Sequence, residues 1–226
     1  RSGPARARNI GAQNVRGTHL VFVDADVCVH SDTLGRIAEH FRNDADLAAI
    51  VGTYDDRPDH PSFLSQYKNL FHRYVHTRSA GLITTFWAGC GAMRRDLFLE
   101  FGGFDADRYQ RPSIEDIELG TRLAIDGHRI ILNAQVQATH LKRWSFWNLL
   151  KTDVLARGIP WVQLMRRVGR IENSLNVTWP QRISVGLGYL SIATLALSIM
   201  QPLHWITTVL IVLAIVVINH DLYRYF

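Results

Sequence analysis

Cysteine is scarce in this sequence of 226 residues. Cys28 and Cys90 stand alone on apolar stretches, and no C-x-x-C spacing occurs. This excludes a disulfide framework and a metal finger, and it favours reduced core thiols in a cytosolic compartment. Aromatic-rich nucleic-acid modules are absent too. We therefore interpret the net charge of +5 as attraction to anionic lipid head groups and phosphorylated groups rather than to nucleic acid.

Charge is nearly absent from Val185 to Ile218, where His204 is the only charge-capable side chain. A polar break at Gln201 splits this run into two apolar pieces, each slightly shorter than the roughly 20 residues of a membrane-spanning helix. With their flanking residues we expect two tilted transmembrane helices, and a buried helical hairpin of a soluble protein is the alternative. Arginines precede the run, namely Arg166, Arg167, Arg170 and Arg182. By the positive-inside rule they place the preceding domain on the cytoplasmic side of the inner (plasma) membrane.

The sequence begins without methionine and without a signal-like segment. Its opening residues, Ser2, Gly3 and Pro4, predict a helix start with a capping serine and an early proline. A doubly wound sheet needs more than one strand before this point. We therefore expect the chain to be a fragment that lacks an N-terminal part of its first domain.

Two carboxylates, Asp24 and Asp26, follow an apolar run from Leu20 to Val23. Four apolar residues without a polar break predict a strand buried on both faces, as in the parallel sheet of an α/β domain. Such sheets bind ligands at the carboxyl ends of their strands. Because two close like charges repel, the pair indicates a bound cation, most simply Mg²⁺ or Mn²⁺ bridging a diphosphate. The alternative is a strand end that runs into an Asp-rich turn.

Further strands and helices alternate along the chain. Apolar spacing predicts helices over residues 4–16, from residue 31 or 32 onward and over 63–79, and strands over 47–54 and 129–133. This alternation is typical of an α/β domain. His72 and His76 stand four residues apart on one helix face, which is the spacing of a metal pair, but no third ligand is near.

A second acidic segment predicts a helix that starts near Asp116. Ser113 followed by Asp116 nearly matches a capping box, so one interpretation of Asp116 is a helix cap. The other is a carboxylate at a helix N-terminus that faces a pocket and is available as a base. The strand over 129–133 then leads to His140, whose imidazole we expect to return to the strand ends.

From Trp144 onward, aromatic and apolar side chains alternate with basic ones. An apolar face with a basic rim is typical of an interfacial helix on a membrane surface, and an ordinary packed helix is the alternative. We therefore divide the chain into an α/β domain over residues 1–143, an amphipathic interfacial segment over 144–182 and a transmembrane hairpin over 183–226.

Five motifs occur in unbroken order over about residues 3 to 160. They are GPARARNIG at 3–11, VDAD at 23–26, GAMRR at 91–95 with GGFD at 102–105, IEDIEL at 114–119 with Arg122 and Leu123 and with GHR at 127–129, and His140. In this order and spacing they resemble family 2 glycosyltransferases of the GT-A fold. The resemblance implies a mixed, Rossmann-like sheet flanked by helices, and an inverting transfer of a sugar from a nucleotide-diphosphate donor.

The resemblance also assigns roles to residues. It implies that Asp24 contacts the nucleotide ribose or the metal, that Asp26 ligates a divalent cation, and that Asp116 is the catalytic base. His140 matches a histidine that completes the metal site in some members of the fold. Further donor-binding positions are Arg8, Asn9 and Glu115. Because the family keeps its first nucleotide-binding strand before residue 1, we expect the isolated chain to be inactive, and the membrane hairpin favours a lipid-linked acceptor.

Two other functions compete with this interpretation. The residues around Asp24 also resemble the nucleophile motif of haloacid dehalogenase-type phosphatases, in which Asp24 would form an aspartyl-phosphate and Asp26 would act as acid and base. That chemistry needs a lysine, and residues 1–141 contain only Lys68, on a predicted surface helix. The other competitor is a membrane-tethered scaffold without catalysis, in which the carboxylates serve structure.

Overall fold

The computed structural model describes residues 3–169 and 175–226. The chain divides into two compact units, residues 1–171 and 172–226, and each unit is described by itself. Ser2 and Arg170, two residues of the expectations above, lie outside the described residues. The bounds of the three parts stay a prediction, whereas the transmembrane character expected for the third part is wrong.

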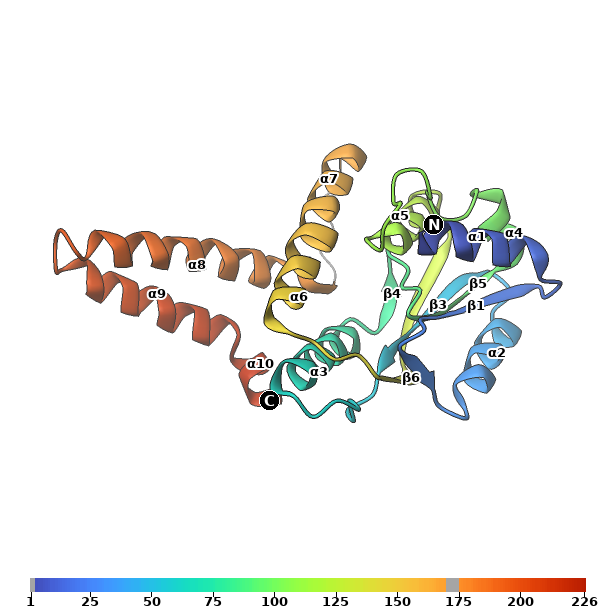
Figure 1. Cartoon of the computed structure of the whole chain (residues 1–226), viewed down its shortest axis with the longest axis horizontal. Helices are drawn as coiled ribbons and strands as arrows, with labels where there is room; N and C mark the ends of the chain where they lie inside the picture. Colours follow the sequence, from blue (N-terminus) through green and yellow to red (C-terminus); the bar gives the residue numbers. More distant parts are fainter. Residues whose placement is uncertain (1–2, 170–174) are drawn as a thin grey trace. The chain divides into compact units, whose positions relative to one another are not determined.

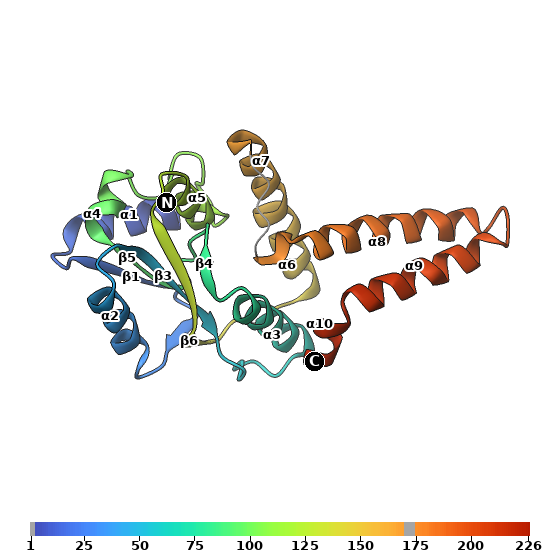
Figure 2. The same cartoon turned by 180° about the vertical axis from the view of Figure 1, so that it is seen from behind.

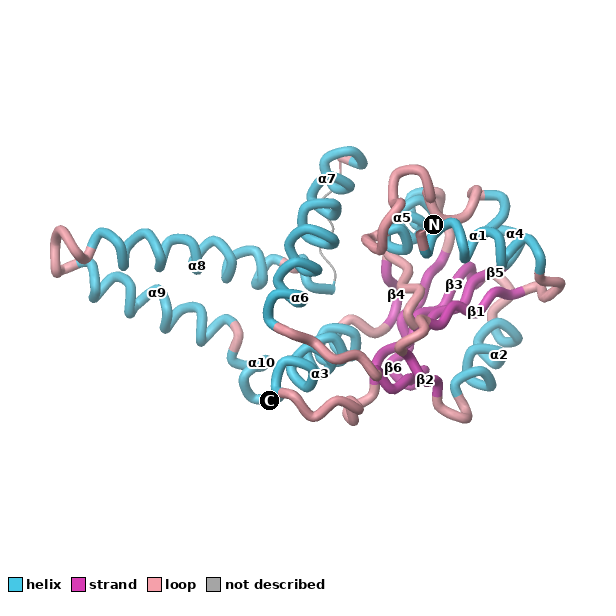
Figure 3. Tube along the Cα trace, in the orientation of Figure 1, coloured by secondary structure: helices cyan, strands magenta, loops and turns pink. Residues whose placement is uncertain are grey.

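The first unit is built on a mixed sheet with the strand order β1-β5-β3-β6-β2, and β4 pairs with β6 at one side of this path (Figures 1 and 3). The strands are β1 (His19–Val23), β2 (Val27–Val29), β3 (Leu47–Tyr54), β4 (Gly81–Ile83), β5 (Cys90–Arg94) and β6 (Arg129–His140). Only β3 and β6 run parallel, and the other pairings are antiparallel. The fold is therefore α/β with a mixed sheet, as the resemblance implies.

Helices flank this sheet (Figures 1 and 2). In the first unit they are α1 (Pro4–Asn14), α2 (Thr33–Asn43), α3 (Phe63–Arg78), α4 (Arg95–Glu100), α5 (Glu115–Ile125), α6 (Phe146–Lys151), the π-helix η1 (Thr152–Gly158) and α7 (Ile159–Val168). The helices expected over 4–16, from residue 31 or 32, over 63–79 and near Asp116 are confirmed, as are the strands over 47–54 and 129–133.

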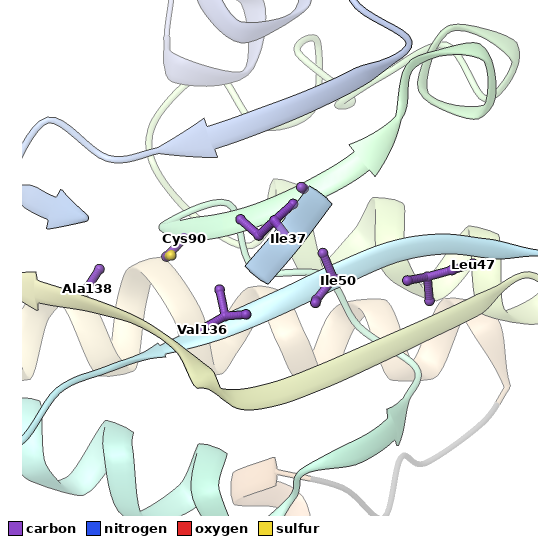
Figure 4. Close-up of a cluster of buried hydrophobic side chains, with 7 residues drawn as sticks. Ile37, Leu47, Ile50, Cys90, Val136 and Ala138 are labelled. Atoms are coloured by element: carbon purple, nitrogen blue, oxygen red, sulfur yellow. The ribbon is translucent and has the colours of Figure 1, made fainter. Parts of the chain in front are cut away.

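One core cluster of this unit lies between α2 and the sheet (Figure 4). Every residue of β3 is buried, because this strand has a neighbour on each side and apolar layers above and below. The cluster consists of Ile37, Leu47, Ile50, Cys90, Ala92, Val136 and Ala138. These contacts hold the ends of β3, β5 and β6 in fixed relation to one another.

Strand β1 differs from the expectation of a strand buried on both faces. Its side chains alternate, with Leu20 and Phe22 buried and Val21 and Val23 about two-fifths exposed. This alternation shows that only one face of β1 is covered, and β1 also lies at the end of the strand order. Phe22 packs against the rings of three other phenylalanines, Phe86, Phe98 and Phe104.

The second unit contains the 3₁₀ turn η2 (Leu175–Val177), α8 (Trp179–Leu197), α9 (His204–Ile218) and α10 (His220–Tyr225). Helices α8 and α9 form a hairpin (Figure 1), and polar bonds join them from Thr208 to Thr194 and from Asn219 to Ser184.

The expectation of two transmembrane helices is wrong, because no helix in the described residues combines the length and apolarity that a membrane crossing requires. Helix α9 is strongly apolar, but its 15 residues rise only about 22 Å against a hydrocarbon core of about 30 Å. Helix α8 has 19 residues, but its apolar character is diluted by small and polar side chains, among them Ser184, Gly186, Gly188, Ser191 and Thr194.

Candidate active site

The two acidic residues predicted from the sequence lie in the turn between β1 and β2. The Asp24 backbone N–H donates to the Gly89 carbonyl at 3.2 Å, and the Asp26 carbonyl accepts from the Leu141 N–H at 2.8 Å. These bonds fix the turn against the segments that precede β5 and follow β6. Both carboxylates remain about one-third exposed, so each can reach a ligand.

Arg8 joins this turn to the start of α5. Its guanidinium bonds Asp24 at 2.5 Å and Glu115 at 3.1 Å, and it lies over the ring of Phe104. The Glu115 side chain is only 5% exposed and also accepts a bond from the Ser113 N–H at 2.9 Å. A buried carboxylate needs such partners. The fold therefore brings three predicted donor-binding residues together in one network, namely Arg8, Asp24 and Glu115.

Asp116 accepts two backbone hydrogen bonds, from Ala88 at 2.9 Å and from Ile117 at 2.8 Å. Burial raises the pKa of Asp116 to about 6, and the negative charge of Glu115 adds to this rise. A carboxylate with a pKa near neutral is suited to general base catalysis. Its capping-box interpretation fails, because the Ser113 hydroxyl donates to the Ala156 carbonyl instead and Ile114 is the N-cap.

The position of Asp116 depends on a close backbone approach at Gly120. A Cβ atom at this position would lie 2.0 Å from the Phe86 nitrogen and 2.4 Å from the Thr85 carbonyl carbon. Only glycine lets α5 approach the segment before β5 this closely. This packing brings Asp116 within hydrogen-bonding distance of Ala88.

His140 lies at the end of β6, paired with Val27, and so does return to the strand ends. Its Nε2 atom is 3.9 Å from Oδ2 of Asp26, and the Lys142 ammonium approaches the same oxygen at 3.4 Å. The ring stacks on Tyr54 at 4.2 Å. Burial lowers the pKa of His140 to about 4, so its imidazole is neutral near pH 7 and offers a lone pair.

Asp26 and His140 fit a divalent cation by the chemistry of their donors, one carboxylate oxygen and one neutral imidazole nitrogen. In residues 3–169 and 175–226, no group of three or more His, Cys, Asp or Glu side chains is arranged to hold a metal ion. A cation held by these two residues would therefore take its other ligands from substrate oxygens and water.

Two aromatic residues near His140, namely Tyr54 and Trp87, are not among the predicted site residues. Trp87 precedes Ala88 and meets Tyr54 edge to face at 4.9 Å. Tyr54 is the last residue of β3, and the carboxyl end of a strand is a signal that could have found it. Its phenol has a pKa raised well above the ordinary value by burial, with Asp24 and Asp26 adding to the rise.

The two histidines of α3 pack with these aromatic rings. His72 and His76 lie 3.8 Å apart between ring centroids, and His72 contacts Trp87 at 4.5 Å. Burial lowers the pKa of His72 well below its usual range and that of His76 to about 4. Nδ1 of His76 is hydrogen-bonded to the Gly52 carbonyl at 2.9 Å. No third ligand joins them among the described residues, so a metal pair finds no support.

Asn9 is placed differently from the other predicted site residues. Its side-chain amide donates to the Phe104 carbonyl at 2.8 Å and its oxygen accepts from the Phe104 N–H at 2.9 Å. Both bonds hold the turn after α4 against α1. A donor-binding role for Asn9 stays a prediction.

The first unit has the organisation of a GT-A-type domain. It combines a mixed sheet, carboxylates at strand ends and a further carboxylate near the start of α5. Residues 1–102 match the family model described as glycosyl transferase family 2. The matched residues include Arg8, Asp24 and Asp26, and they end before Asp116. This match, which covers less than half of the 226 residues, supports a glycosyltransferase.

Three solved structures resemble the chain, and the first of them shares its fold. A mannosyltransferase from Pyrobaculum calidifontis, in complex with GDP-Man and Mn²⁺, is 20% identical with a TM-score of 0.55, over 97% of this chain and 67% of that one. GalNAc-T7 with UDP, GalNAc and Mn²⁺ is 17% identical with a TM-score of 0.47, over 64% of this chain and 31% of that one. TarS from S. aureus is 16% identical with a TM-score of 0.45, over 62% and 40%. No curated protein sequence matches the chain.

Proposed function

We propose that this protein transfers a sugar from a nucleotide-diphosphate donor to an acceptor hydroxyl with inversion at the anomeric carbon. The observation that carries the proposal is the placement of Asp116, a carboxylate with a pKa of about 6, on the same α5 N-terminus as the Arg8–Glu115–Asp24 network. The Pyrobaculum mannosyltransferase, which binds GDP-Man, supports it as a protein of the same fold.

In this proposal Asp116 takes the proton of the acceptor hydroxyl. The acceptor oxygen then forms a bond to the anomeric carbon, while the bond from that carbon to the diphosphate oxygen breaks. The electron pair of the broken bond leaves with the nucleoside diphosphate. An alcohol is a poor nucleophile without a base, which is why a carboxylate that is ionised near neutral pH matters here. A single displacement of this kind inverts the anomeric configuration.

Asp26 and His140 are the residues that would hold a divalent cation, Mg²⁺ or Mn²⁺. Such a cation, when bound, stabilises the negative charge that develops on the leaving diphosphate. Asp24 and Arg8 would position the nucleotide part of the donor, with Glu115 holding Arg8 in place.

The segment that follows the sheet offers a surface for a membrane-bound acceptor. Large apolar side chains are exposed along α6, η1 and α7, namely Phe146, Trp147, Leu150, Val154, Leu155, Ile159 and Val162. Exposed basic residues accompany them, among them Arg143 and Lys151. We propose that this segment lies on the cytoplasmic surface of the inner membrane, where a lipid-linked acceptor would be within reach.

The competing phosphatase finds no support in the site. Its Asp24 would need a lysine beside it, but Asp24 pairs with Arg8. Lys68 is half-buried and donates to both oxygens of Asp153 at 2.8 and 2.6 Å, instead of lying on an open helix surface.

The test measures release of nucleoside diphosphate by the full-length protein from a panel of UDP-, GDP- and dTDP-sugars. Membrane extract serves as the acceptor source, and each donor is assayed with Mn²⁺, with Mg²⁺ and with chelator. Metal-dependent release from one donor is expected. An Asp126→Asn variant, which changes an exposed carboxylate at the end of the same helix, should behave as wild type. A folded protein that releases nothing from any donor would overturn the proposal.

A further inference from the structure

The π-helix η1 is anchored to both helices that border the candidate site. The Ser113 hydroxyl, three residues before Asp116, donates to the Ala156 carbonyl at 2.6 Å. Lys68 of α3 bonds Asp153 at 2.6 Å, and the Ser65 hydroxyl of the same helix accepts from the Trp144 N–H at 2.9 Å. Figures 1 and 2 show the run of α6 and α7, with η1 between them, beside α3 and α5.

Gly158 ends η1 at a close backbone approach. A Cβ atom there would lie 2.9 Å from the Asp153 carbonyl oxygen, five residues earlier, so a side chain has little room at this turn. π-Helical turns are rare, and they occur frequently at functional sites. The side chain immediately before this glycine is Arg157.

Arg157 carries a charge that the fold does not neutralise. Its nearest carboxylate is Asp153, at 3.9 Å, and both oxygens of Asp153 already accept hydrogen bonds from Lys68. Within the part of the chain that the structure describes, Arg157 makes no closer ion pair. Its side chain is 45% exposed, so the guanidinium can accept an anionic ligand.

Contacts of η1 bring Arg157 beside α3: its partner Asp153 also bonds Lys68, which stands one helical turn before His72 on that helix. The charge of Arg157 adds to the larger effect of burial, which lowers the pKa of His72. At the same place, Nδ1 of His72 is buried and has no hydrogen-bond partner among the described residues. A cation and an unpaired polar atom thus share one region.

We propose that Arg157 binds a phosphate group of the substrate, and that this group is the diphosphate of the sugar donor. The proposal rests on the proposed function and adds a binding residue from η1, outside the segment that matches the family model. Arginine suits this task, because its planar guanidinium can donate two parallel hydrogen bonds to phosphate oxygens. In the tautomer that carries its proton on Nδ1, His72 would donate a further bond. A phosphorylated acceptor would present the same chemistry.

The experiment compares wild type with Arg157→Gln and Arg157→Lys in the full-length protein, by calorimetric binding of UDP, GDP and inorganic pyrophosphate in the presence of Mn²⁺. Arg166→Gln is the matched control, since Arg166 is an exposed arginine of the next helix. We expect Arg157→Gln to weaken binding of pyrophosphate and of the preferred nucleotide about 10-fold, Arg157→Lys to weaken it less, and the control to match wild type.

A further arm separates the two sources of phosphate. Inorganic phosphate is titrated with the nucleotide at saturation. In one outcome, wild type still binds inorganic phosphate when its donor site is filled with nucleotide. If Arg157→Gln loses this phosphate binding but keeps its nucleotide affinity, the result contradicts the donor assignment and points to a phosphorylated acceptor. A different result would overturn the inference and leave the proposed function standing: Arg157→Gln binds every probe as tightly as wild type, while Asp26→Asn binds them more weakly. Pyrophosphate binding that depends on Arg157 without any sugar transfer would support the inference and contradict the proposed function.

Discussion

The Asp116 carboxylate accepts a hydrogen bond from the Ala88 backbone N–H at 2.9 Å, across 28 residues of sequence. This bond ties the start of α5 to the segment that carries Trp87. Because the bond favours the ionised form, it limits how far burial can raise the pKa of Asp116. The candidate base is therefore held in place and kept ionisable by the same contact.

The pH dependence of transfer should report the ionisation of Asp116. A base acts only when it is deprotonated, so the rate should fall as the pH drops through about 6, where half of Asp116 is protonated. Initial rates between about pH 5 and 8, at saturating donor and metal, measure this fall, which is the acidic limb of the pH–rate profile. A rate that stays constant down to pH 5 would contradict the assignment of Asp116 as the base.

Two substitutions should move this limb in opposite directions. Glu115→Gln removes the neighbouring negative charge that raises the pKa of Asp116, so the limb should move to lower pH. Arg8→Met removes a positive charge that lowers the same pKa, so the limb should move to higher pH. Matched pH profiles of the two variants measure both shifts. Shifts of the same sign would show that the limb does not belong to Asp116.

Gly120→Ala should destabilise the fold by about 1 to 3 kcal/mol, because the added methyl group overlaps backbone atoms of Thr85 and Phe86 that cannot move easily. Gly35→Ala is the control: this α2 glycine has open space around its Cβ position, and alanine there should stabilise the helix by up to about 1 kcal/mol. Urea unfolding of both variants measures the difference. A tolerated Gly120→Ala would contradict the close approach of α5.

Removal of either proposed metal-binding residue should weaken cation binding without unfolding the protein. Asp26→Asn and His140→Gln each remove one donor, and we expect about 10- to 100-fold weaker binding of Mn²⁺. Asp32→Asn is a suitable control, because this exposed carboxylate pairs with Arg36 and lies in a different loop. Titration of Mn²⁺ in the presence of nucleoside diphosphate gives the affinities. Unchanged affinity in both variants would place the cation elsewhere.

Much of the fold could be predicted from local patterns. Strand β3 has the bounds expected for the run from Leu47 to Tyr54, because a strand between two neighbours is apolar along its whole length. The same reasoning failed for β1. Four apolar residues do not reveal whether a second face is covered, and Val21 and Val23 are exposed. The transmembrane expectation failed because the flanking residues do not lengthen α9 beyond 15 residues and because α8 mixes small and polar side chains with its apolar ones.

The candidate site could be predicted only in part, for a physical reason. Asp24, Asp26 and Asp116 stand at element ends, and element ends can be read from sequence. The contacts around them join residues far apart in the sequence. Arg8 bonds Glu115, which is 107 residues away, and Lys68 bonds Asp153, which is 85 residues away. No local pattern encodes such pairs. In the sequence, Arg157 looks no different from the other basic residues of the amphipathic segment.

The most direct test of the account compares Asp116→Asn with wild type in two measurements, donor binding and turnover. The substitution removes a charge whose burial destabilises the folded state increasingly between about pH 4 and pH 6, but its amide NH2 replaces one of the two oxygens that accept backbone hydrogen bonds, so urea unfolding of the variant is the control. We predict that turnover falls at least about 100-fold while donor affinity is unchanged. If Asp116→Asn keeps its turnover and only Asp24→Asn loses turnover, the result contradicts the central claim that Asp116 is the catalytic base.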